Sequence, residues 1–423
     1  MITSVDALNY RCLRYLQQDL GSFHVLVGPN ASGKTTFLDV VAFLGRLVAD
    51  GLDAAVSERS QNFQDLVWNR EGGVFELALE ARIPEPKQKL VNQGGKHAFG
   101  AVRYEVQVGL DAESGESGIF SERVVLKAAR VGVPVARNGV FPFARLPAKT
   151  ILTSKVKREA RTVLTKKQGG NDYFYSEVTP ESGKGWFPSI KLGPKKSALG
   201  NLPEDEAKFP VATWLKSFLS VGVQQLMLNS LLIRKASPPG QSRTFKPDGS
   251  NLPWVVSDLQ KRAETRVRDW IGHVQTALPD LEGLRIVDRE DDRHKYLVLQ
   301  YRDGLEVPSW MASDGTLRLL ALTLPAYLPD LSGVFLIEEP ENGIHPRAVE
   351  TVFQSLSSVY GAQILMATHS PVILSIVQPR QVLCFSKTDD GATDIVNGSE
   401  HPALKDWRGE TNLGVLFAGG VLG

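Results

Sequence analysis

Eight residues near the N-terminus, Gly28 to Thr35, have the types and spacing of a phosphate-binding loop. The segment reads GPNASGKT. Its glycines allow backbone N–H groups to point inward around phosphate oxygens, and a helix that follows adds its positive N-terminal end. In this pattern Lys34 reaches the β- and γ-phosphates of a nucleotide, and the hydroxyl of Thr35 binds Mg²⁺. We therefore expect nucleotide contacts from Gly28, Pro29, Asn30, Ala31, Ser32, Gly33, Lys34, Thr35 and Thr36.

Two carboxylates, Glu338 and Glu339, follow a short apolar run late in the chain, Val334 to Ile337. A carboxylate at the end of a strand beside a phosphate loop is placed to help hold Mg²⁺. A second carboxylate there can orient and deprotonate an attacking water. The alternative is a solvated acidic pair at a strand end. A phosphate loop in the same chain favours the catalytic interpretation.

A histidine follows another apolar run in the same way. His369 comes after Ile364–Ala367, in the sequence Thr368-His369-Ser370. A histidine at a strand end is often structural, but a neutral imidazole here could contact a γ-phosphate or hold the water. We favour the functional interpretation because strand-then-histidine repeats the arrangement of strand-then-glutamate.

A second anion-binding type of turn lies at 309–318, in the segment SWMASDGTLR. Ser313 or Asp314 is expected to cap a helix whose buried stripe is Leu317, Leu320 and Leu324. A Ser-x-Gly turn at a helix start is also suited to an anion. Because the chain already has its own phosphate loop, Ser313 and Gly315 would serve the nucleotide of a second copy, packed head to tail. The Asp314 carboxylate would then have to point away from the phosphate.

The elements that must position these residues are those of an α/β protein. Residues 23–27 predict a strand, and the residues after Gly33 predict a helix. Alternating residues around 76–82 and 104–110 predict half-solvated antiparallel strands, with a loop over 84–100. Residues 131–205 are irregular in pattern, and 206–280 look mostly helical. The runs at 334–337, 364–367 and 381–385 predict buried parallel strands, with a helix over 347–359. No heptad pattern predicts a coiled-coil arm.

These motifs, in this order, resemble an ATP-binding-cassette head of the kind shared by SMC proteins, RecF and the overcoming-lysogenization-defect family. GPNASGKT matches the phosphate loop, and SDGTLR resembles the signature motif in its RecF-like form. VFLIEEPENGIHP resembles the magnesium strand and dimer loop, and ATHSPVIL the switch-histidine region. NYRCL, which contains Arg11, resembles the Asn-aromatic-Arg segment of these heads. Residues 248–252 and 413–418 also look like compact bacterial AAA-type ATPases of the RecF-like class, which are often encoded in anti-phage defence operons beside an effector or nuclease.

The resemblance implies a P-loop NTPase head with an antiparallel β lobe and a helical or irregular insertion. Its parts would be the N-terminal half of the head (1–130), a basic insertion (131–205), a helical subdomain (206–280) and the C-terminal half of the head (281–423). ATP and Mg²⁺ would be the cofactors, and two copies would sandwich ATP.

The resemblance also assigns roles to single residues. Glu338 becomes the magnesium ligand with Thr35, although many members have Asp there. Glu339 becomes the catalytic base and His369 the switch. Arg11 contacts nucleotide, and Ser313 with Gly315 forms the signature, preceded by Ala312 in place of the usual Leu. Gln61 and Gln64 both remain candidates for the glutamine loop.

Charge and composition limit the partners. The chain has 48 basic and 47 acidic residues, so its formal net charge is +1, but residues 145–196 hold 12 Lys/Arg against 4 Asp/Glu. This basic segment also contains five aromatic residues, which leaves RecF-like DNA binding open beside docking of a separate effector or nuclease subunit. We expect no nuclease domain and no membrane segment in this chain, which argues against a transporter engine. Two cysteines and no signal peptide pattern fit a cytoplasmic protein.

Overall fold

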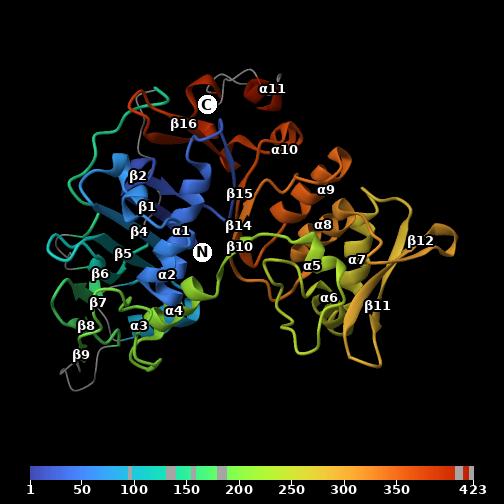
Figure 1. The fold of residues 1–423 in the computed structure, drawn as a ribbon, viewed down its shortest axis with the longest axis horizontal. Helices are drawn as coiled ribbons and strands as arrows, with labels where there is room; N and C mark the ends of the chain where they lie inside the picture. Colours follow the sequence, from blue (N-terminus) through green and yellow to red (C-terminus); the bar gives the residue numbers. More distant parts are fainter. Residues whose placement is uncertain (94–97, 130–139, 154–158, 179–187, 405–412, 419–423) are drawn as a thin grey trace.

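The computed structural model describes residues 1–423 except 94–97, 130–139, 154–158, 179–187, 405–412 and 419–423. The chain forms three β-sheets with helices around them. A central sheet lies between an antiparallel lobe and a helical lobe (Figure 1). No described helix is both long enough and apolar enough to cross a membrane.

The central sheet has the strand order β10-β14-β15-β3-β16-β17, and all neighbours are parallel except β16 and β17. The predicted buried strands are confirmed. The strand β10 lies within the region expected to be helical, and its pairing with β14 makes it an edge strand of the central sheet. The bounds are β3 Phe23–Val27, β10 Val223–Leu226, β14 Gly333–Glu338, β15 Ala362–Ala367, β16 Val382–Lys387 and β17 Thr393–Asn397.

Each face of the central sheet buries a separate hydrophobic core, because successive side chains of a strand point to opposite faces. Leu26, Leu336 and Leu365 pack toward the helix α1 (Lys34–Asp50) and the antiparallel lobe. Val25, Phe335 and Ile364 pack toward the helical lobe. Continuous apolar runs are thus required in these strands. The parallel arrangement brings the ends of β3, β14 and β15 to one edge of the sheet.

The antiparallel lobe is an eight-stranded sheet of order β2-β1-β4-β5-β6-β7-β8-β9. It continues past residue 130 into the segment expected to be irregular, so the sheet crosses the expected boundary between the head and the basic insertion. Its strands are β1 Ile2–Tyr10, β2 Leu13–Asp19, β4 Val74–Arg82, β5 Ala101–Leu110, β6 Ser117–Lys127, β7 Arg161–Lys167, β8 Asp172–Phe174 and β9 Ser189–Ile190.

The expectation that β4 and β5 are half-solvated is wrong, because nearly all of their residues are buried. Their polar side chains form a charge network instead. The Arg103 guanidinium lies 2.7 Å from Asp6 and 3.0 Å from Glu105. The segment 150–153 covers this face: the carbonyl of Ile151 accepts from Arg103 at 3.0 Å, and its N–H donates to Glu76 at 2.7 Å. The alternation of polar and apolar residues in β4 and β5 therefore reflects a polar face of the sheet. Other parts of the protein, and not water, cover this face.

The expected loop over 84–100 contains the helix α3 (Glu85–Asn92). Pro86 lies in its first turn, where proline costs nothing because that N–H has no helical partner. Two further helices flank the antiparallel lobe or α1, namely α2 Leu52–Ser57 and α4 Pro210–Ser220. The longest described helix, α1, has 17 residues, so the described part of the chain has no coiled-coil arm.

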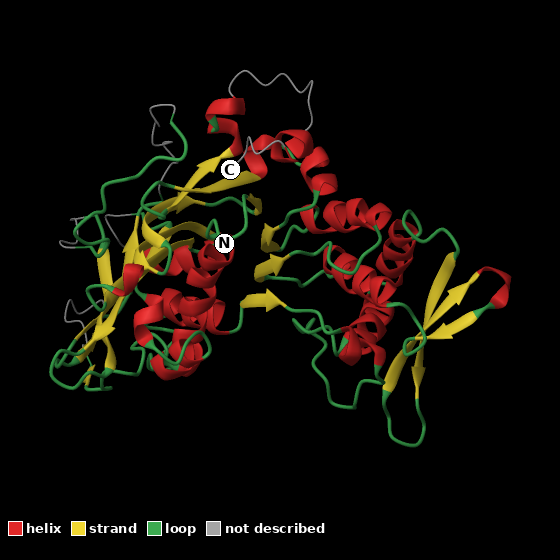
Figure 2. Ribbon diagram, turned by 45° about the horizontal axis from the view of Figure 1, so that its top comes forward, coloured by secondary structure: helices red, strands yellow, loops and turns green. Residues whose placement is uncertain are grey.

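The helical lobe ends in a small three-stranded sheet that projects away from the rest of the molecule (Figure 2). Its strands are β11 Leu281–Asp288, β12 Lys295–Tyr301 and β13 Glu306–Pro308. Its helices are α5 Ser230–Arg234, α6 Leu252–Arg262, α7 Glu264–Val274, α8 Asp314–Thr323 and α9 Pro346–Ser357; α10 Pro371–Ile376 and α11 Leu413–Ala418 follow near the C-terminus.

Candidate nucleotide-binding site

The loop between β3 and α1 is held against the central sheet so closely that two of its positions exclude a side chain. Gly33, the N-cap of α1, has φ 105°, and a Cβ there would overlap the hydroxyl of Thr393 on β17. A Cβ at Gly28 would overlap the carbonyl oxygen of Phe385 on β16. Glycine is required at both positions, because other residues would strain the backbone and collide with the sheet. The loop thus has the backbone conformation that the sequence pattern predicts.

Lys34 lies at the start of α1 with its ammonium group inside this loop. Its Nζ donates to the carbonyl oxygens of Gly28 at 2.8 Å and Pro29 at 2.9 Å. Burial lowers the pKa of Lys34, and the charges of Glu339 and Glu338 oppose this shift. These carbonyls hold the ammonium where phosphate oxygens would be additional acceptors.

The next residue, Thr35, meets Glu338 across 303 positions of sequence. Its Oγ1 donates to Glu338 Oε2 at 2.5 Å, at the end of β14. A hydroxyl and a carboxylate oxygen are ligands that Mg²⁺ accepts, and protein sites for this ion commonly supply only one or two carboxylates beside phosphate oxygens. The donor set therefore fits Mg²⁺ bound together with a nucleotide.

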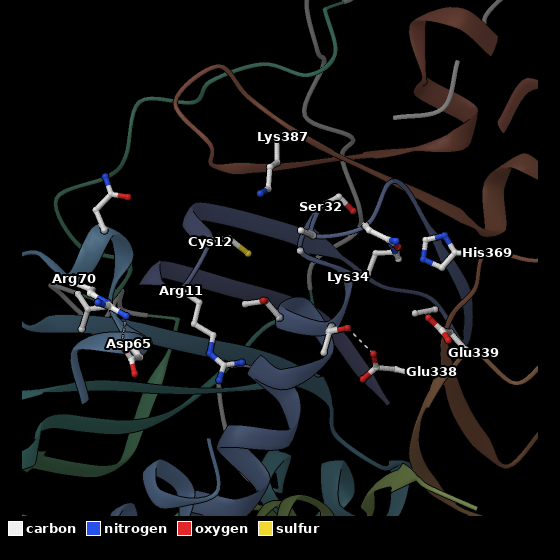
Figure 3. A pocket seen from close by; sticks show the side chains of 18 residues that line it. Arg11, Cys12, Ser32, Lys34, Asp65, Arg70, Glu338, Glu339, His369 and Lys387 are labelled. Carbon is white, nitrogen blue, oxygen red and sulfur yellow. Dashed lines mark hydrogen bonds and ion pairs between the residues drawn. The ribbon is translucent and has the colours of Figure 1, made fainter. Parts of the chain in front are cut away.

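Glu339 leaves the end of β14 in a left-handed conformation, with φ 47°. Its N–H donates to the carbonyl of Ala367 on β15 at 2.8 Å, and its carboxylate accepts from the amide of Asn342. Figure 3 shows Glu339 and His369 beside Lys34, on the side where Glu338 contacts Thr35. The local backbone thus turns this carboxylate into the cavity and away from the direction of the strand.

His369 follows the end of β15, and burial together with the positive charge of Lys34 lowers its pKa. This shift favours the neutral imidazole, and the charges of Glu339 and Glu341 oppose it. Glu341 fixes this segment: one of its oxygens accepts from Thr368 Oγ1 at 2.7 Å and from the N–H of His369 at 2.9 Å. Glu341 was not among the residues predicted from the sequence to belong to the site. The signal was the third carboxylate of EEPENG, two residues beyond Glu339.

These groups line a cavity of about 540 Å³. Five of the eight described non-glycine residues with positive φ line it, and backbone strain of this kind concentrates at functional sites. They are Arg11, Ala31, Asn69, Arg70 and Glu339. The cavity also takes in the loop residues 30–36, Glu338 and His369, together with Cys12, Asp65, Val67, Ala367 and Lys387.

A protein-family model described as "AAA domain, putative AbiEii toxin, Type IV TA system" matches residues 23–90 and 157–375 of this chain. The chain belongs to this AAA-domain family. The matched residues include the phosphate loop, both carboxylates and His369.

The chain is also similar in fold to solved structures. An Smc head bound to the C-winged helix domain of ScpA is similar with a TM-score of 0.52 at 11% identity, covering 93% of this chain and 97% of that one. An Smc head with an extended coiled coil, bound to the C-terminal domain of ScpA and derived from Pyrococcus furiosus, has a TM-score of 0.49 at 12% identity, covering 96% and 98%. The AAA domain therefore has the α/β fold of an SMC-like ATPase head, as the sequence predicted.

Arg11 lies in the turn between β1 and β2 and lines the cavity of the AAA domain. Its guanidinium is 3.2 Å from Asp39 on α1, and Asp39 also accepts from Tyr10 at 2.6 Å. The backbone N–H of Arg11 donates to the carbonyl of Leu66 at 3.0 Å. These contacts fix the turn at the end of the cavity formed by residues 65–70.

The turn Ser313–Gly315 of the AAA domain does not line its own nucleotide cavity. Ser313 is exposed and is the N-cap of α8, where its Oγ accepts from the N–H of Thr316 at 3.1 Å. Asp314 is paired with Arg234 of α5 at 3.0 Å. A Cβ at Gly315 would lie 2.8 Å from the carbonyl oxygen of Gly343, in the loop after Glu339. The cap and the engaged Asp314 carboxylate agree with expectation, whereas contact with a second copy stays a prediction.

Neither candidate for the glutamine loop, Gln61 or Gln64, contacts Glu338. A glutamine from another part of the chain, Gln225 on β10, contacts Glu338 instead. Its Nε2 lies 3.4 Å from Glu338 Oε1. Gln225 was not considered for this contact because residues 206–280 were expected to be mostly helical. A strand of four residues, Val223–Leu226, has too little pattern to be separated from the helix before it.

Proposed function

We propose that this AAA domain binds ATP with Mg²⁺ and hydrolyses it in the cavity described above. The observation that carries this proposal is the contact of Thr35 with Glu338, at the mouth of a phosphate loop where Glu339 and His369 also lie. The cavity thereby combines a lysine placed to bind phosphate, two oxygen ligands for a metal and two groups able to position water. Phosphoryl transfer needs these parts.

In this mechanism the backbone of 28–34 and the Lys34 ammonium hold the β- and γ-phosphates. Bound Mg²⁺ would neutralise charge on the phosphate oxygens. Glu339 orients a water and accepts its proton while the water oxygen bonds to the γ-phosphorus. The bond from that phosphorus to the β–γ bridging oxygen breaks, which yields ADP and inorganic phosphate. Neutral His369 holds the γ-phosphate or the water by a hydrogen bond.

The second part of the proposal is an ATP-sandwiched dimer. Ser313 is exposed and the turn at 313–315 lies outside the cavity of its own chain, which supports a role toward the nucleotide of another copy. Two copies facing head to tail would complete two pockets. ATP then acts as an interfacial ligand that favours the closed state, and hydrolysis reopens it.

The third part is that this dimer, as a cytoplasmic protein, switches a separate effector subunit in bacterial anti-phage defence. The family description names a putative toxin of a toxin–antitoxin system, and the similar Smc head is bound to a domain of another protein, ScpA. The first supports a role in a toxin-type system, and the second supports a role beside a separate partner protein. Copurification of a second polypeptide with the tagged protein tests this part.

Replacing Thr35 by valine is expected to lower Mg²⁺-dependent ATP turnover about 100-fold, because the metal loses a ligand while the side-chain volume is kept. Turnover is measured across a Mg²⁺ titration. Thr35→Ser is the matched control, since it retains the hydroxyl, and it should stay within a few-fold of the wild-type rate. A valine variant with wild-type turnover and wild-type Mg²⁺ requirement would remove Thr35 from the mechanism.

The alternative function is RecF-like DNA binding through residues 145–196. The stacked rings of Tyr173 and Tyr175, with centroids 6.4 Å apart, favour DNA binding. Ion pairs within the protein oppose it, because they engage lysines of this segment that would otherwise bind phosphate groups. Lys166 is buried against Asp172 at 3.0 Å, and Lys195 is paired with Asp53 at 3.4 Å. Filter binding across a salt series separates the two functions. DNA binding predicts affinity that falls steeply with salt, whereas effector docking predicts no specific retention of DNA.

A further inference from the structure

A second cavity, which we call the Arg318 cavity, opens beside the nucleotide cavity and also has a volume of about 540 Å³. It is lined by residues 225–231, which run from β10 into α5, together with Arg318 of α8 and Glu338. Glu338 thus borders both cavities. Since β10 and β3 lie on opposite sides of β14, the Arg318 cavity is on the side of Glu338 away from the strand that carries the phosphate loop.

Arg318 has no partner that explains its position. Within the described residues it forms no ion pair, and its Nε is buried without a hydrogen-bond acceptor. Its side-chain stem packs against the loop after Glu339, where a Cβ at Gly343 would lie 3.5 Å from Arg318 Cδ. Arg234 on α5, by contrast, is paired with Asp314. A buried donor without an acceptor is destabilising, and an anion bound in the cavity beside Arg318 would supply the acceptor.

The lining of the Arg318 cavity favours a small oxyanion. Among the residues that the structure describes, Arg318 and Glu338 are the only charged ones that line it, and Glu338 is already engaged by Thr35 and suited to Mg²⁺. Met227 and Leu231 form an exposed apolar rim, and an apolar surround strengthens the attraction of a single cation for an anion.

We propose that the Arg318 cavity receives the inorganic phosphate released by hydrolysis, with Arg318 as its transient binding group. The inference rests on the proposed function, because that reaction supplies the phosphate. When a second copy covers the nucleotide cavity, phosphate needs another way out. The Arg318 cavity borders the nucleotide cavity at Glu338, on the side where the cleaved bond would lie, and Mg²⁺ at Glu338 would offset the carboxylate charge that would otherwise repel the anion.

The test measures inhibition of steady-state ATP turnover by added inorganic phosphate. Arg318→Met keeps the stem that packs on Gly343 and removes the charge. It should raise the inhibition constant for phosphate about tenfold, the expected effect of losing one charged hydrogen bond, and Arg318→Lys should restore most of the affinity. The matched control is Arg243→Met, which removes an exposed arginine of the same lobe that is paired with Asp258 and should leave the constant unchanged.

An unchanged inhibition constant in Arg318→Met, in a protein that hydrolyses ATP, would overturn the inference and leave the proposed function intact. A wild-type protein without ATP hydrolysis would overturn the proposed function instead. Crystals of the ADP- and Mg²⁺-loaded wild-type protein soaked in tungstate give a measurement that needs no variant. Tungstate density at Arg318 supports the inference, and density confined to the phosphate loop contradicts it.

Discussion

Glu339→Gln is expected to lower ATP turnover by about 10²–10⁴-fold, the usual contribution of a general base, while ATP still binds. Glutamine retains the size of the side chain and its contact with Asn342 but cannot accept the proton of the attacking water. Because hydrolysis is what reopens the dimer in our proposal, the variant should accumulate as an ATP-bound dimer. Gel filtration with light scattering, with ATP and Mg²⁺ present, measures this directly.

Two controls make the Glu339 result specific. The same variant with ADP should elute as a monomer, because the γ-phosphate is the group that the second copy contacts. Glu350→Gln removes a carboxylate from the exposed side of α9, where it bonds only Gln354 in the described structure, and should behave as wild type. If Glu339→Gln hydrolyses slowly yet remains monomeric with ATP, catalysis is supported and the sandwiched dimer is not.

Mixing two inactive variants is expected to restore activity. Ser313→Asp places a negative charge where a γ-phosphate would bind but still caps α8, because Asp is as good an N-cap as Ser. Lys34→Met removes the cation of the phosphate loop. Each variant alone should lose about 100-fold or more in turnover. A mixed dimer has one intact pocket, built from the loop of the Ser313 variant and the turn of the Lys34 variant.

The mixture should therefore recover roughly a quarter of wild-type turnover, since random pairing makes about half of the dimers mixed and each has one working pocket. Turnover is measured at constant total protein with the ratio of the variants changed in steps. Ser313→Asn, which caps without a charge, should stay close to wild type and separates the effect of charge from that of the helix cap. A mixture with no more activity than its components would show that Ser313 does not serve a second copy.

Most of the site could be predicted because its parts are local in sequence. The phosphate loop is eight consecutive residues whose glycines are required by backbone geometry, and α1 begins directly after Gly33. Glu338, Glu339 and His369 each follow an apolar run, and parallel strands end at one edge of the sheet. The cap of α8 by Ser313 was equally local.

Other residues of the site could not be predicted from the sequence, because the residues that they contact are far away in the chain. Gln225 reaches Glu338 only because a strand of four residues pairs with β14, over 100 positions later. Arg318 was part of the SDGTLR motif, but its unpaired state depends on what residues 225–231 place around it. No pattern within a short window carries this information.

The sequence by itself determined the phosphate loop, the apolar strands with polar residues at their ends and the capped helix, because each depends on backbone conformation and periodicity within a few residues. Only the tertiary structure decided which polar faces are covered, as at Arg103 beneath the segment 150–153. Tertiary structure alone also joined Thr35 to Glu338 and left Arg318 facing a second cavity. The physical reason is that burial and pairing depend on contacts between distant segments, and an alternating or basic stretch looks the same in sequence whether water or protein covers it.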